Sequence, residues 1–423
     1  MLYNVQNMNS LRLGIFLAIK TVRHASLWTT SLIIFVMLIT FLNLVVVSGV
    51  LVGLIQGSEV AFREKYLGDV TASALEKKTY VQKPNEIQNI LRGMPDVLGY
   101  SSRYLSAGSI EANYKTRKSD DIANKKGVVI RGIDPEAEDV VTSLSDNILE
   151  GEYLKREDAS KYILVGKDVL AKYSIVSDVD PSALRDVEPG TKVRIQINGK
   201  DESYEYIVKG ILKIKAADLS SGVFMVDSEL RNISGKNVDD ISEIAIKKTK
   251  EGNSVKIRDT LLQNGLGQYA KIQTFEEGTP AFVIQMKQLF GLLGTVFGSI
   301  GIVVAAITLF IVIFINALTK RKQIGILKGI GISSGTILWS YVFQSVFYAL
   351  CGSILGLAAT FGWLKPLFEK YPIDFPFSDG ILVAEVSTTL IRVGVLVFVA
   401  LLAGFIPAWM VVRRNTLDAI LGR

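Results

Sequence analysis

Four long apolar runs constrain what this chain of 423 residues can fold into. A transmembrane helix needs roughly 20 mostly apolar residues. Four segments reach that length: residues 27–55, 289–318, 334–362 and 391–412. The first run is too long, and lies too late in the chain, for a cleaved signal peptide, so we expect a retained anchor. The sequence therefore predicts an α-helical membrane protein with four transmembrane helices.

The segment between the first two runs has a different composition. Residues 57–283 hold 33 Lys and Arg against 36 Asp and Glu, a net charge of −3, whereas the remainder holds 14 against 5, a net charge of +9. Alternating apolar and polar residues predict short β-strands, for example at 192–197 and 243–248, with helical patterns between them. We expect a large mixed α+β domain inserted between helices 1 and 2.

The excess of basic residues flanks the apolar runs, which indicates membrane orientation rather than nucleic-acid binding. The loop between the third and fourth runs, residues 363–385, instead has two Lys and four acidic residues. Three segments are basic: Arg12, Lys20 and Arg23 before the first run, Lys320, Arg321, Lys322 and Lys328 after the second, and Arg413, Arg414 and Arg423 after the fourth. Because basic loops stay inside, we predict a multi-pass protein with both termini cytoplasmic and the large domain extracytoplasmic.

This organisation divides the chain into four segments. Residues 1–26 are expected to form a cytoplasmic amphipathic N-terminal helix, and residues 27–56 to form transmembrane helix 1, continuing as a stalk to about residue 67. An ordinary polar flank is the alternative to the stalk. Residues 57–283 form the extracytoplasmic domain. Residues 284–423 hold three transmembrane helices, a cytoplasmic helix at 320–332 and a cytoplasmic C-terminal tail.

The residue types exclude several kinds of site. One Cys, Cys351, and one His, His24, permit no intramolecular disulfide and are a poor basis for a metal site. The acidic stretch "GIDPEAEDV" (132–140) lacks the alternating carboxylates of an EF-hand, so we expect a turn that caps a following helix. No phosphate-binding loop, zinc-protease motif or nucleophile elbow occurs. We predict no catalytic, cofactor-binding or metal-binding residues, and the free energy for any transport must come from a partner.

The segment 320–332, "KRKQIGILKGIGI", lies between the second and third runs. Helical spacing places Ile324, Leu327 and Ile330 with Gly331 along one stripe. A short helix with such an apolar ridge can dock into a groove on another protein. A membrane-surface connector with basic anchors is the equal alternative. The candidate site residues are Arg321, Lys322, Gln323, Ile324, Leu327, Lys328, Ile330 and Gly331.

Three stretches resemble a known family. "RKQIGILKGIGIS" (321–333) is similar to the cytoplasmic loop of ABC-transporter permeases in the superfamily of the macrolide exporter MacB, the lipoprotein-releasing permeases LolC and LolE, and the cell-division protein FtsX, with Gln323 in place of the usual Glu. The tail "PAWMVVRRNTLDAIL" (407–421) resembles the family's ending, with Asn415 and Thr416 where Asp-Pro is usual. Residues 127–173 resemble the lipoprotein-releasing branch, to which the chain is expected to be closest.

The resemblance implies a function and a set of partners. The chain would be a permease subunit in a bacterial inner membrane that couples ATP hydrolysis by a separate cytoplasmic ATPase to motion of the extracytoplasmic domain. It would thereby move or release a lipid-linked or amphipathic substrate. Residues 320–332 would be the coupling helix, ATP and Mg²⁺ would bind the ATPase, and this chain would bind no cofactor and be no enzyme. The other implied partners are a second permease subunit (itself or a paralogue), the lipid bilayer and an extracytoplasmic adaptor or acceptor, but no nucleic acid.

Two other functions stay open at this point. An FtsX-like permease would transport nothing and would instead regulate an extracytoplasmic hydrolase. A membrane-anchored enzyme or sensor would carry its activity in the large domain, and the absence of catalytic motifs argues against it.

Overall fold

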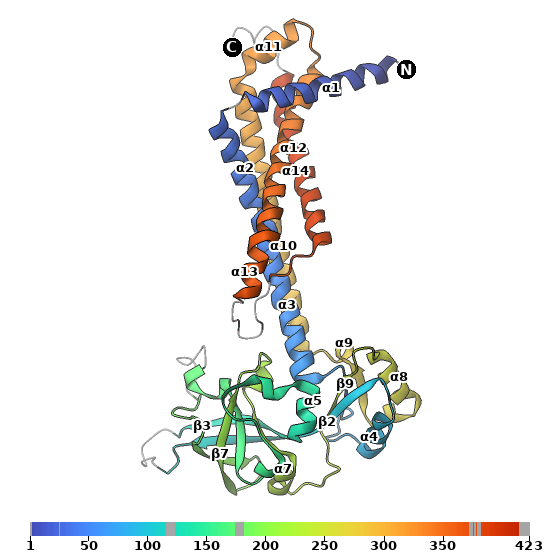
Figure 1. The fold of residues 1–423 in the computed structure, drawn as a ribbon, viewed down its shortest axis with the longest axis vertical. Helices are drawn as coiled ribbons and strands as arrows, with labels where there is room; N and C mark the ends of the chain where they lie inside the picture. The colour runs from blue at the N-terminus through green and yellow to red at the C-terminus, as the bar shows by residue number, and fades with distance from the viewer. Residues whose placement is uncertain are drawn as a thin grey trace. The chain divides into compact units, whose positions relative to one another are not determined.

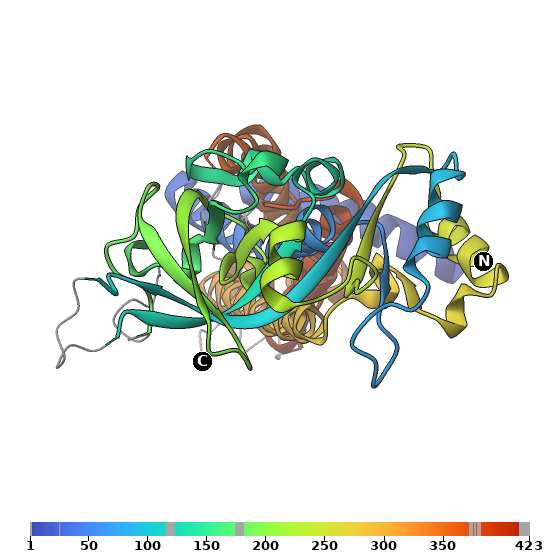
Figure 2. The same ribbon diagram turned by 90° about the horizontal axis from the view of Figure 1, so that it is seen from below.

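The computed structural model describes residues 2–24, 26–115, 123–173, 182–371, 375, 378 and 382–413. The tail after Arg413 and the acidic loop residues Asp374 and Asp379 lie outside the described residues. The chain forms two compact units (Figures 1 and 2). One unit holds Met1–Ile55, Met286–Asp374 and Asp379–Arg423, and the other holds Gln56–Gln285 and Phe375–Ser378.

The first unit consists of helices (Figure 1). Helix α1 (Leu2–Arg23) precedes four helices that, within the part of the chain that the structure describes, are long and apolar enough to cross a membrane. These are Leu27–Leu67, Val283–Thr319, Ser334–Lys370 and Val386–Val412. Each predicted apolar run lies inside one of them, and a mixed α/β domain lies between the first two. The predicted fold class is therefore confirmed.

The first and the third of the long helices contain π-helical turns. The first consists of α2 (Leu27–Leu42), the π-helical turn Asn43–Val47, α3 (Ser48–Phe62) and a second π-helical turn, Arg63–Leu67. The second is α10 (Ala281–Thr319), and the short helix α11 (Arg321–Gly329) follows it. The third consists of α12 (Ser334–Ala359), the π-helical turn Thr360–Leu364 and α13 (Lys365–Lys370), and the fourth is α14 (Val386–Val412). The first helix thus continues past residue 56, the expected end of the span, to Leu67.

Glycines let the first and third membrane helices pack closely. A Cβ on Gly352 would lie 2.6 Å from Met37 Cβ, and one on Gly356 would lie 2.2 Å from Phe41 Cδ1. A side chain at either position would therefore push α12 away from α2, as expected of small residues at membrane helix contacts. Other apolar residues complete this core: Ile33, Val45, Ala305, Leu309, Tyr348, Ala349, Leu396, Ala400 and Ala403.

The second unit is built on one sheet. Its ten strands among the described residues follow the order β10-β1-β9-β2-β3-β8-β5-β7-β4, and β6 pairs with both β2 and β7. The pairs β3–β8 and β5–β7 are parallel, and the other pairs are antiparallel. The strands are β1 (Val70–Ser73), β2 (Val97–Ala112), β3 (Lys125–Ile133), β4 (Ile148–Gly151), β5 (Tyr162–Gly166), β6 (Lys192–Ile197), β7 (Ser203–Leu212), β8 (Val223–Val226), β9 (Glu243–Lys248) and β10 (Lys271–Thr274).

Strand β2 belongs to both halves of this sheet. Its first part pairs with β9, and its second part pairs with β3 and β6. Figure 2 shows β2, in cyan, running across the unit. One half packs with α4 (Pro84–Arg92) and α8 (Ser254–Gln263), and the other packs with α7 (Asp227–Ser234). Three further α-helices of this unit are α5 (Pro135–Thr142), α6 (Ala217–Ser220) and α9 (Phe275–Gly278).

Local predictions within this domain agree with the structure. The expected strands at 192–197 and 243–248 are β6 and β9 with the same bounds. In the acidic stretch, Asp134 Oδ1 accepts hydrogen bonds from the N–H groups of Glu136 (3.2 Å) and Ala137 (3.5 Å) and so caps α5. The expected capping turn is confirmed, because a carboxylate at this position satisfies the free donors of the first helical turn.

Candidate functional site

Helix α11 ends in a turn that requires glycine. The N–H of Gly331 donates to the carbonyl of Lys328, and the N–H of Ile332 donates to the carbonyl of Leu327, both at 3.0 Å. Gly331 has a φ of +94°. This is a Schellman ending, in which glycine adopts the left-handed conformation that other residues avoid. The helix is shorter than the expected 320–332, because its last three expected residues form this turn.

One face of α11 packs against the membrane helices. Ile324 is only 4% exposed, and Leu327 is half-buried. Their side chains join an apolar cluster with residues of α10, α12 and α14: Ile313, Ala317, Ile337, Tyr341, Ala408, Val411 and Val412. Complete burial of an apolar side chain of this size contributes roughly 1.5–3 kcal/mol. Ile324 and Leu327 therefore fix α11 to its own chain.

Lys328 ties α11 to the end of the last membrane helix. Its ammonium donates a hydrogen bond to the backbone carbonyl of Val412, the last residue of α14. The final carbonyls of a helix lack intrahelical donors and carry partial negative charge, so a cation is favourable there. At the other end of α11, partial burial lowers the pKa of Lys320 below its ordinary value. Both lysines thus lie partly within the chain's own packing.

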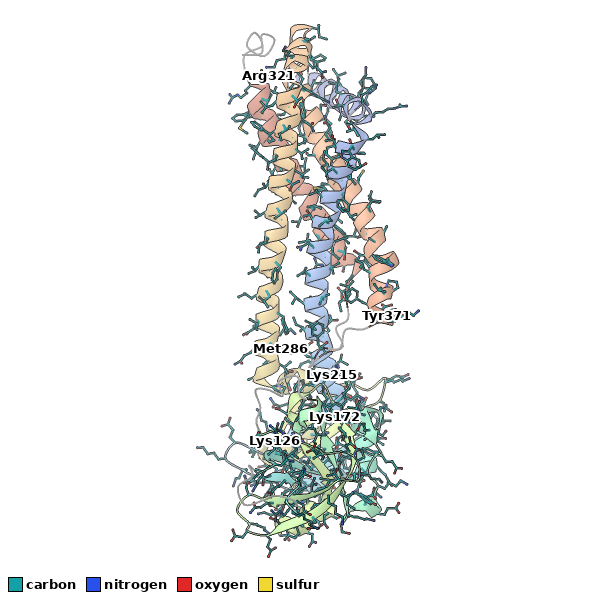
Figure 3. The ribbon with its side chains drawn as sticks, turned by 90° about the vertical axis from the view of Figure 1, so that its left-hand side faces the viewer. Lys126, Lys172, Lys215, Met286, Arg321 and Tyr371 are labelled. Atoms are coloured by element: carbon teal, nitrogen blue, oxygen red, sulfur yellow. The ribbon has the colours of Figure 1, made fainter. Side chains whose placement is uncertain are left out.

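The opposite face of α11 is exposed. We call it the outer face, and it consists of Lys322, Gln323, Ile326 and Gly329 of the helix and Ile330 of the turn. Ile326 is 57% exposed and Ile330 is 72% exposed. Two uncovered isoleucines beside a cation and an amide form a surface that suits contact with another protein. Figure 3 shows the neighbouring Arg321, which is half-buried, and Tyr371 at opposite ends of the first unit.

The predicted stripe is therefore divided between two faces. Ile324 and Leu327 point into the chain's own core, whereas Ile330 belongs to the outer face. Helical spacing identifies a stripe but does not say what covers it. Ile326 was not selected from the sequence, and it is exposed because it lies roughly 200° around the helix from Ile324.

A buried ion cluster lies in the second unit. Arg103 is 2% exposed, and its guanidinium lies 2.7 Å from Glu138 Oε1 and 2.9 Å from Glu243 Oε1. Burial by itself lowers the pKa of Arg103, but the two carboxylates outweigh burial and raise it above the ordinary value. The ring centre of Tyr66, in the π-helical turn Arg63–Leu67, lies 5.4 Å from the guanidinium carbon.

The same π-helical turn is bonded to the sheet. Arg63 Nη2 lies 2.7 Å from Asp69 Oδ1, and Asp69 Oδ2 accepts a 3.0 Å hydrogen bond from the N–H of Lys248 in β9. The end of the first long helix is thus fixed to the inserted domain. Arg63 and Asp69 lie six positions apart, but Asp69 meets Lys248 only through long-range strand pairing, which sequence reasoning missed.

Comparison with known proteins finds a family model that matches the region around α11. Residues 295–416, which include α11, match the family model described as FtsX-like permease C-terminal. The ABC transporter permease YtrF of Bacillus subtilis (strain 168) is 23% identical over 239 residues, which cover 52% of this chain and 53% of YtrF. The chain therefore spans about half the length of this curated relative.

Two solved structures are each similar to about half of this chain. The periplasmic region of MacB from Actinobacillus actinomycetemcomitans is 15% identical with a TM-score of 0.35, and the match covers 51% of this chain and 92% of that one. The extracellular domain of the noncanonic ABC-type transporter YknZ from Gram-positive bacteria is 15% identical with a TM-score of 0.32, covering 48% and 97%. Likenesses this distant assign no function. The expected closeness to the lipoprotein-releasing branch stays a prediction.

Proposed function

We propose that this chain is the permease subunit of an ABC transporter whose ATPase is a separate cytoplasmic subunit. The FtsX-like domain and the YtrF relative support this class. The observation that carries the proposal is the two-sided geometry of α11. Its inner face and Lys328 are fixed to α10, α12 and α14, while Ile326 and Ile330 are uncovered. A partner that moves α11 by its outer face would move these helices with it.

ATP and Mg²⁺ belong to the partner in this proposal, and the chain itself transmits motion. Closure of the ATPase would act on α11, and the first long helix would carry motion to the inserted domain. The bonds of Arg63 and Asp69 at the end of that helix support this route. About 5.5 kcal/mol is needed to shift a two-state equilibrium from 1:99 to 99:1, which is the scale of ATP hydrolysis.

The substrate class in this proposal is lipid-linked or amphipathic. It rests on the resemblance of residues 127–173 to lipoprotein-releasing permeases. The purified complex with its ATPase, reconstituted in vesicles, should hydrolyse ATP faster when a lipoprotein is present. The same protein without its acyl chains is the control. Equal hydrolysis with both forms would refute a lipid-linked protein as the substrate and leave the permease proposal standing.

Docking of the ATPase is tested by co-purification. A tagged chain is extracted from its native cells in mild detergent, and bound proteins with nucleotide-binding motifs are identified. Wild type should retain an ATPase subunit, and Ile326→Asp should lose it because a charge replaces an exposed apolar contact. Val238→Asp is the matched control, since Val238 is 78% exposed and lies in the second unit. Retention by Ile326→Asp, or loss from both variants, contradicts docking on the outer face.

A further inference from the structure

Helix α1 has one face buried against its own chain and one face uncovered. Ala18 is 5% exposed, and a Cβ on Gly14 would lie 3.1 Å from Trp339 Cβ of α12. On the other side, Phe16 is 60% exposed and Ile19 is 63% exposed. Helix α1 is already packed along its other face, so these two large apolar side chains need a separate apolar environment.

The position of α1 identifies that surrounding as a membrane surface. Helix α1 ends at Arg23, and the first membrane helix begins at Leu27. Leu27 and Trp28 are both 84% exposed, and a Trp at the end of a span is typical of the lipid headgroup region. Figure 1 shows α1, in dark blue, crossing the ends of the long helices of the first unit rather than running along them.

The charge of α1 favours one class of lipid. Arg12, Lys20 and Arg23 are all exposed. Acidic residues do not balance them, because the first acidic residue in the sequence is Glu59. Long basic side chains can lie along an apolar surface and place their charges at its polar edge. Basic residues beside a span bind anionic headgroups, each contributing up to about fivefold to binding.

We infer that α1 is a binding surface for anionic phospholipids. Phe16 and Ile19 enter the interfacial region of the bilayer, while Arg12, Lys20 and Arg23 bind lipid phosphate groups. The selectivity is electrostatic, so it weakens as salt shortens the Debye length from about 10 Å at 0.1 M to about 3 Å at 1 M. The inference does not depend on the proposed transport function.

Lipid selectivity of the full chain tests the inference. The chain is reconstituted in phosphatidylcholine bilayers with a trace of spin-labelled phosphatidylglycerol or phosphatidylcholine, and electron paramagnetic resonance measures the immobilised fraction of each lipid. Wild type should prefer phosphatidylglycerol at low salt. Replacing Arg12, Lys20 and Arg23 together by Gln should lower that preference at least about twofold.

Two further variants separate charge from structure. Arg12→Lys with Arg23→Lys keeps the charge, so it should keep the preference. Replacing Lys78, Lys250 and Lys271 by Gln removes the same charge from exposed positions in the second unit, so the preference should also remain. The inference is overturned if the triple α1 variant keeps the wild-type preference, or if the second-unit variant loses as much.

Discussion

Two glycines near the end of α11 should respond in opposite ways to replacement by alanine. Gly331 has a φ of +94°, whereas Gly329 is helical and a Cβ there would meet no atom within 4 Å. We expect Gly331→Ala to destabilise the chain by about 1 kcal/mol, because the left-handed conformation strains other residues. Gly329→Ala should stabilise it by up to about 1 kcal/mol, because Ala favours a helix. The thermal unfolding midpoint in detergent measures both, and shifts of the same sign contradict the Schellman ending.

Arg103 is the residue on which the ion cluster of the second unit depends. Arg103→Met would leave the buried carboxylates of Glu138 and Glu243 without their cation, at a cost of about 3–5 kcal/mol. Arg156→Met is the control, since its 59% exposed side chain pairs with Asp134 at the surface, where solvent screens the ion pair. Hydrogen exchange should speed up in β2 and β9 only in the Arg103 variant. Unchanged exchange there would mean that the cluster adds no stability.

At the scale of elements, two alanine substitutions on α11 test which face of the helix packs against the membrane helices. Ile324→Ala should cost about 2–4 kcal/mol, because it opens a cavity in a packed cluster. Ile326→Ala should change stability by about 0.5 kcal/mol or less, because that side chain is 57% exposed. Tryptophan fluorescence follows this unit selectively, since Trp28, Trp339, Trp363 and Trp409 all lie outside residues 57–283. Equal costs would contradict the orientation of α11.

The elements that could be predicted from the sequence are those that depend on residues close together in the chain. The four spans, β6, β9 and the Asp134 cap depend on residues within a few turns or strand positions of one another. The 16-residue strand β2 was missed because its first part pairs with the distant strand β9. The Arg103 cluster was missed because Glu138 and Glu243 lie 35 and 140 positions from Arg103. The stripe on α11 lies between these cases. The helical spacing of the stripe could be predicted from the sequence. The burial of Ile324 could not, because the residues that bury it come from α10, α12 and α14.

At the scale of the whole molecule, the predicted orientation can be measured directly. Single cysteines at Lys78 or Lys322 are introduced after Cys351→Ser, the replacement of the one native cysteine. Both positions are exposed. In cells whose outer layers admit the reagent but whose inner membrane is intact, a membrane-impermeant maleimide should label the cysteine of Lys78→Cys. Lys322→Cys should react only after the inner membrane is opened. Labelling in the reverse order would invert the predicted topology.

Strand β2 has a mechanical consequence for the inserted domain. Because it pairs with β9 along its first part and with β3 and β6 along its second, a load applied at β9 is passed to the other half through a single continuous piece of backbone. Its ladder hydrogen bonds lie across the strand, so a pull along β2 loads many of them together in shear rather than opening them one by one. The two halves of the sheet should therefore move together, as one rigid body, when the domain is under tension.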